Sequence, residues 1–131
     1  MEDNKNLSSE IFETAMEYLP RLIDGLEQAS GYFKRKENAK GFQLLGEASD
    51  GLMWFNQVVL GLPVILPQGE NITDVRDNWK PYTDALQNTL DFIEKNNADE
   101  VAKNLDNEII PFIRMIYGKI GNLQNENPYT Q

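Results

Sequence analysis

The chain has 131 residues, of which 40% are hydrophobic and 25% are charged, and it contains neither histidine nor cysteine. The formal net charge of −9 opposes binding to nucleic-acid backbones and to anionic lipid, because both attract basic surfaces. Without histidine and cysteine, the usual metal sites, thiol chemistry, Cys–His or Ser–His catalysis and disulfides lack their working groups. The composition therefore predicts one small domain without a cofactor.

The N-terminal sequence MEDNKNLSSE is polar and acidic, whereas a secretory signal begins with a basic and then an apolar region. The most apolar stretch, Leu52–Leu66, is interrupted by polar residues and is too short to span a bilayer. The lack of cysteine fits a reducing compartment. We therefore expect a cytoplasmic protein that does not contact membranes.

Apolar residues recur at helical spacing in four successive segments, and none alternates for long enough to predict a strand. The predicted helices run from about Ser9 to Lys36, Ala39 to Leu60, Thr73 to Asn96, and Asp99 to Leu123. Gly61 and Pro63 are expected to end the second helix, and Asp99 is expected to cap the fourth.

Short links at residues 36–38 and 96–98 predict two helical hairpins, joined by a proline-containing crossover over residues 60–72. The predicted fold class is therefore all-α, an antiparallel four-helix bundle. We expect a single domain over residues 1–124 and a flexible tail over residues 125–131.

Interior prolines occur in three of the predicted helices, at Pro20, Pro81 and Pro111. Proline lacks an N–H and crowds the carbonyl four residues earlier, so each proline is expected to kink its helix. Curvature around a core is the interpretation that we favour. In the alternative, a carbonyl freed at Met16 or Asn107 helps to line a functional site.

Two repeated patterns bear on packing. Both predicted turns contain Lys-x-Asn-Ala, at Lys36–Ala39 and Lys95–Ala98, 59 positions apart, which hints at related hairpins. The tripeptide Asp-Gly-Leu occurs at Asp24–Leu26 and at Asp50–Leu52. Glycine within a helix costs about 1 kcal/mol relative to alanine, so we expect both glycines to permit close approach of two backbones. Both aspartates point away from the core stripes and are expected to be solvated rather than to form a paired-carboxylate site.

An acidic face on the first predicted helix combines four carboxylates within about 60° of one another on the helical wheel. These residues are Glu10, Glu13, Glu17 and Asp24. A solvated face is the simplest interpretation, and a docking surface for a basic partner is the alternative. A metal site is disfavoured, because diiron bundles need Glu-x-x-His and calcium sites need oxygens that converge from a tight loop.

The second predicted helix gives the main functional prediction, because apolar residues continue beyond its core stripe. A helix that is apolar nearly all round is buried nearly all round. We therefore expect a second copy of the chain or another protein to cover its outer face and the Pro63–Pro67 connection, unless that connection folds back over it. The predicted partner-binding residues are Trp54, Val58, Leu62, Val64, Ile65 and Leu66.

Catalytic residues are not predicted. A mutase-like bundle would need arginines that converge on a dianion, and the four arginines of this chain do not converge in the predicted bundle. No Gly-rich phosphate loop and no Gly-x-Ser-x-Gly motif occurs. We expect a non-enzymatic interaction module, adaptor or chaperone-like, that binds a protein partner or forms a homodimer. The alternative is a ligand-binding or catalytic bundle with a polar interior pocket.

Three runs, Tyr18–Leu26, Asp50–Trp54 and Glu108–Phe112, carry a resemblance over most of the chain. They resemble a family of small uncharacterised bacterial helical proteins that share leucine-proline, glycine-leucine-x-tryptophan and acidic-apolar-proline motifs. The resemblance implies a bacterial, cytosolic helical bundle and implies no activity. The general character of the chain is also similar to that of small acidic export chaperones, such as those of flagellar secretion.

Overall fold

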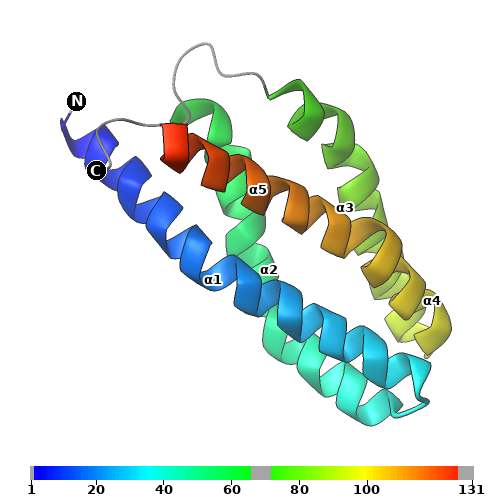
Figure 1. The fold of residues 1–131 in the computed structure, drawn as a ribbon. Helices are drawn as coiled ribbons and strands as arrows, with labels where there is room; N and C mark the ends of the chain where they lie inside the picture. Colours follow the sequence, from blue (N-terminus) through cyan, green and yellow to red (C-terminus); the bar gives the residue numbers. More distant parts are fainter. Residues whose placement is uncertain (1, 66–71, 127–131) are drawn as a thin grey trace.

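The computed structural model describes the backbone of residues 2–65 and 72–126, and this part of the chain is helical almost throughout (Figure 1). The elements are α1 (Glu2–Lys34), α2 (Asn38–Ile65), α3 (Thr73–Glu94), α4 (Ala98–Asn104), the π-helical segment η1 (Leu105–Ile109) and α5 (Ile110–Glu126). Because α4, η1 and α5 follow one another without a break, the described residues form four helical rods and no strand. The predicted all-α helical bundle is confirmed.

Several predicted helix ends were wrong. The first helix begins at Glu2, and the second continues through Gly61 and Pro63 to Ile65. A proline near the end of a helix removes only one backbone hydrogen bond, so Pro63 does not stop α2. The helix α5 includes the first two residues of the predicted tail, and residues 127–131 lie outside the described part of the chain.

The cap of the fourth rod is Asn97 rather than Asp99. The Asn97 side chain accepts a hydrogen bond from the backbone N–H of Glu100 at 3.4 Å, which satisfies one of the free donors of the first turn. Asp99 instead lies inside that turn and pairs with Lys36 at 2.9 Å. This ion pair joins the two hairpin turns, but both side chains are largely exposed and the pair contributes little to stability.

The two hairpin turns share one geometry, in which a residue with positive φ follows the helix. These residues are Lys36 (φ 64°) and Asn96 (φ 55°), which lie 60 positions apart. The shared hydrogen bonds run from Lys36 N–H to Phe33 O, Glu37 N–H to Tyr32 O, Asn96 N–H to Ile93 O, and Asn97 N–H to Phe92 O. The turn geometry therefore pairs Lys36 with Asn96, whereas the Lys-x-Asn-Ala match pairs Lys36 with Lys95, one residue earlier. The turn geometry, and not that tetrapeptide, makes the two links alike.

The helix α1 is central to the packing, because its backbone approaches those of α2, α4 and α5 closely. The helix α3 lies closest to α4 and less close to α5. Figure 1 shows that α3 and α5 diverge with distance from the second turn. Between α2, α3 and α5 the space is filled by large aromatic side chains. The Tyr82 and Phe112 rings stack with centroids 4.3 Å apart, and Phe55 meets both rings edge-on.

In the first hairpin, two glycines of α2 lie directly against aromatic side chains of α1. A Cβ added at Gly41 would lie 2.6 Å from the Phe33 ring, and one added at Gly51 would overlap the Tyr18 hydroxyl. The close approach predicted at Gly51 is therefore to a side chain and not to a backbone. No heavy atom lies within 4 Å of the Cβ position of Gly25, so close approach does not explain that glycine.

The segment η1 is tied to α1 by a polar contact. The buried Ser30 hydroxyl donates to the Asp106 carboxylate at 2.8 Å, and Lys34 pairs with the other oxygen of Asp106. The same carboxylate therefore satisfies a buried donor and a surface cation.

Within the described ranges, no helix combines the length and the apolar character needed to cross a membrane.

Candidate functional site

The structure separates the six predicted partner-binding residues. Val58 and Leu62 are only 8% and 1% exposed, so the prediction that they lie on an outer face was wrong. Leu62 belongs to the hydrophobic core, and α2 packs on α1 on one side and faces the aromatic residues of α3 and α5 on another. Trp54 is half-buried, and its ring meets the Tyr18 ring edge-on at 5.5 Å. Leu66 and the side chain of Ile65 lie outside the described residues.

The exposed apolar residues of α2 form a different line, which we call the α2 stripe: Met53, Leu60 and Val64. Their exposed fractions are 62%, 64% and 85%, and Val64 alone was among the predicted residues. At spacings of seven and four residues, the three side chains lie within about 40° of one another on the helix. No charged residue occurs between Asp50 and Glu70, so the stripe lies on a helix segment without charge.

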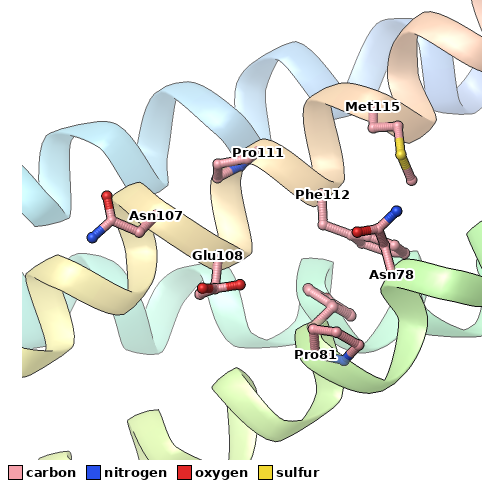
Figure 2. Close-up of a pocket in the computed structure, with 8 residues that line it drawn as sticks. Asn78, Pro81, Asn107, Glu108, Pro111, Phe112 and Met115 are labelled. Carbon is pink, nitrogen blue, oxygen red and sulfur yellow. The ribbon is translucent and has the colours of Figure 1, made fainter. Parts of the chain in front are cut away.

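A groove of about 240 Å³ lies between α3 and the η1–α5 rod, and we call it the proline groove (Figure 2). Its lining residues are Asn78, Pro81, Tyr82, Asn107, Glu108, Pro111, Phe112 and Met115. The stacked rings of Tyr82 and Phe112 are buried, so they form its base, and the two prolines come from opposite helices. Sequence reasoning noted both prolines and missed that they line the same groove.

Pro111 is preceded by the π-helical segment. The N–H of Ile110 donates to the carbonyl of Leu105, five residues earlier, and the next residue, Pro111, has no N–H to donate. The carbonyl of Asn107 therefore lacks its ordinary α-helical donor. Asn107 lines the groove and Met16 does not, so the alternative interpretation of Pro111 remains a prediction for this groove. Single π turns within α-helices often occur at functional sites.

The polar side chains of the proline groove are one carboxylate, two amides and the hydroxyl of Tyr82. Figure 2 shows Glu108 extending from η1 toward α3, and Asn78 extending from α3 toward Phe112 and Met115. The Asn78 amide donates to the Asp74 carbonyl at 2.7 Å, which leaves its own oxygen to accept. Glu108 is exposed and has no ion pair with any described residue. No cationic residue lines the groove.

The hydroxyl of Tyr82 does not face the groove as a free acid. It donates to the side-chain oxygen of Asn56 on α2 at 2.6 Å, and burial raises the pKa of this phenol well above its ordinary value. Tyr82 therefore remains protonated and acts as a structural donor between α2 and α3.

The four carboxylates of the predicted acidic face, Glu10, Glu13, Glu17 and Asp24, are exposed on α1. Gln28 donates to Asp24 at 2.7 Å, and among the residues that the structure describes no group of three or more carboxylates is placed to hold a metal ion.

At the first turn, a hydrogen bond from Arg35 lowers the pKa of Glu37, and one from Lys36 lowers the pKa of Asp99.

The arginines are dispersed among several contacts. Arg35 pairs with Glu37 at 3.1 Å, and Arg114 pairs with Glu27. Arg21 lines a second, more open groove of about 170 Å³ between α1 and α2, which also contains Glu47. With opposite charges in the same small groove, this surface has no net preference for an anion.

No curated protein and no solved structure matches the chain. The sequence profile of the domain of unknown function DUF8042 matches residues 10–118. This match runs from the first turns of α1 into α5 and includes both hairpin turns, the α2 stripe and the proline groove. The chain therefore belongs to the DUF8042 family.

Proposed function

We propose that this protein is a non-enzymatic interaction module that forms a homodimer through the α2 stripe. The single observation that carries the proposal is the alignment of Met53, Leu60 and Val64 along the outer face of α2. The one other large apolar side chain that is exposed among the described residues is Leu90, which lies alone on α3. Scattered exposed leucines are normal on soluble proteins, whereas an aligned apolar row is a feature of interaction surfaces.

A second copy of the chain is the occupant that the charge pattern favours. Each copy carries a net charge of −9, so two copies repel each other unless they meet through a surface without carboxylates. The helix segment that follows Asp50 provides such a surface. An antiparallel pairing of two α2 helices around a twofold axis would bring the α2 stripe of one copy against the α2 stripe of the other, as symmetric dimers require.

The expected dimer is weak. An apolar patch of this kind covers on the order of 300–600 Å², less than the roughly 800 Å² that each partner buries in a stable complex. Dimerisation should therefore depend on protein concentration.

The proposal includes a cytoplasmic location, which the absence of cysteine supports.

Sedimentation velocity over a dilution series tests the proposal with two matched variants. Leu60→Glu places a carboxylate in the stripe, and Leu90→Glu places one at the isolated exposed leucine of α3. We expect Leu60→Glu to weaken dimerisation at least tenfold, since a buried interfacial charge costs more than about 1.4 kcal/mol. Leu90→Glu should dimerise like the unmodified chain.

Thermal unfolding followed by circular dichroism should show that both variants remain folded, because both leucines are exposed. Trp54→Glu is a poor test, since that substitution would also break the packing of Trp54 on Tyr18. A monomer at every concentration, or equal loss of dimer in both variants, would refute the proposal.

A further inference from the structure

We infer that the proline groove binds an arginine side chain presented by an exposed segment of a partner protein. The inference does not depend on dimerisation through the α2 stripe, because the groove is formed by α3, η1 and α5. It rests on the hydrogen-bonding character of the groove, on its size and on its charge.

Several hydrogen-bond acceptors line the groove. The carboxylate of Glu108 and the side-chain oxygen of Asn78 can accept hydrogen bonds, the carbonyl of Asn107 lacks its α-helical donor, and none of the described lining side chains is cationic. A guanidinium group has five N–H donors in a planar fork, which can engage a carboxylate with two hydrogen bonds and still reach neighbouring oxygens. An ammonium group offers three donors from a single strongly hydrated point.

The apolar walls suit the rest of an arginine side chain. Pro81 and Pro111 flank the buried ring of Phe112, and Met115 adds a flexible thioether. The aliphatic stem of arginine packs on apolar surface while its charged end remains near polar groups. The weak hydration of guanidinium makes this burial less costly than burial of an ammonium.

The size of the groove argues for a side chain rather than a free small molecule. Pockets that enclose drug-sized ligands measure about 300–1,000 Å³ and bury most of the ligand surface. The proline groove measures about 240 Å³ and is partly open to solvent. A side chain can enter it while the partner's backbone remains outside and makes further contacts.

Charge complementarity favours a basic partner. The chain carries 21 acidic against 12 basic residues, so its overall field attracts basic segments and raises their rate of encounter. Within that field, the carboxylate of Glu108 has no ion pair with a described residue and lies beside apolar walls. The field brings a basic segment to the surface, and the groove selects the position of one side chain.

Amide NMR titration of the full chain tests the inference with the peptide acetyl-Gly-Gly-Arg-Gly-Gly-amide. We expect a dissociation constant on the order of 1 mM, with shifts concentrated at Asn78, Glu108 and Met115. Peptides with citrulline or lysine in place of arginine are the comparison probes. Citrulline keeps the shape and loses the charge, so its peptide should bind at least tenfold more weakly, since a charge-assisted hydrogen bond contributes more than about one decade of affinity. The lysine peptide should bind more weakly than the arginine peptide.

Two variants with the same change in net charge separate the groove from the general acidic field. Glu108→Gln should weaken the arginine peptide at least tenfold, whereas Glu13→Gln on the exposed surface of α1 should change its affinity by less than about twofold. Both residues are exposed, so neither substitution should disturb the fold. Equal binding of the citrulline peptide, equal effects of the two variants, or shifts spread along the acidic face of α1 would overturn the inference.

Discussion

The two hairpins of this molecule begin with the same turn and then pack in different ways. In the first hairpin, the backbones of α1 and α2 stay close, and Gly41 and Gly51 leave room for the side chains of Phe33 and Tyr18. In the second, α3 is closest to α4 near the turn and less close to α5, and aromatic rings fill the widening space. A shared turn geometry therefore does not determine how two helices continue.

The difference has a functional consequence. The closely packed first hairpin has a smaller and more open groove of about 170 Å³ between α1 and α2, whereas the second hairpin, held apart by stacked rings, has a groove of about 240 Å³ beside those rings. In this molecule the proline groove lies where α3 and the η1–α5 rod diverge, and the Tyr82–Phe112 stack forms its base. The candidate binding surface is thus a product of the looser hairpin.

The largest effect is expected from Phe112→Ala, which removes the ring that contacts Tyr82, Phe55 and Trp79. Because Phe112 is buried, its truncation should lower the free energy of unfolding by about 3–5 kcal/mol, measured by urea denaturation. Hydrogen exchange should show loss of protection in α3 before loss in α1 and α2. A cost below about 1 kcal/mol, or uniform loss of protection, would show that the rings do not hold the second hairpin together.

An intermediate effect is expected from two glycines of α2 that lie in different surroundings. Gly41→Ala places a methyl group against the Phe33 ring and should destabilise the protein by about 1–3 kcal/mol. Gly46→Ala meets nothing within 4 Å and should stabilise it by about 0.5–1 kcal/mol, because alanine favours the helix. Chemical denaturation of both variants measures the contrast. If both substitutions stabilise, the first hairpin does not depend on close packing at Gly41.

The sequence predicted most of the fold, because helical periodicity is a local property and the buried residues of α1 and α5 follow it. It failed on α2, where apolar residues surround the helix and the wheel does not show which of them are covered. Val58 is buried although it lies away from the core stripe, so its burial depends on the tertiary arrangement of the helices. The spacing of Met53, Leu60 and Val64 was present in the sequence, but their exposure depends on that tertiary arrangement.

The proline groove depends even more on tertiary structure. Pro81 and Pro111 were each expected to bend a helix, and nothing local in the sequence indicates that they lie on opposite sides of one groove. The π turn before Pro111 adds a residue to one turn and changes which side chains face α3. Periodicity assumes one constant angle per residue, so it cannot represent this change.

The smallest effect is expected from Tyr82→Phe, which keeps the ring stack and removes the hydrogen bond from the Tyr82 hydroxyl to Asn56 of α2. Near neutral pH the variant should be less stable by about 1 kcal/mol, since the Asn56 oxygen loses its donor. Burial raises the pKa of Tyr82 in the folded protein, so the folded state keeps the phenol protonated at a pH where the unfolded chain ionises.

The stability that this raised pKa provides is complete below the unfolded pKa of about 10 and declines as pH rises toward the folded value. Phenylalanine cannot ionise, so the variant escapes this part of the alkaline loss. The gap in unfolding free energy between the two proteins should therefore narrow above about pH 10, and urea denaturation over that range measures it. A difference in unfolding free energy that stays constant with pH would show that water reaches the Tyr82 hydroxyl in the folded protein. The aromatic packing of the second hairpin would then be looser than the distances between its rings indicate.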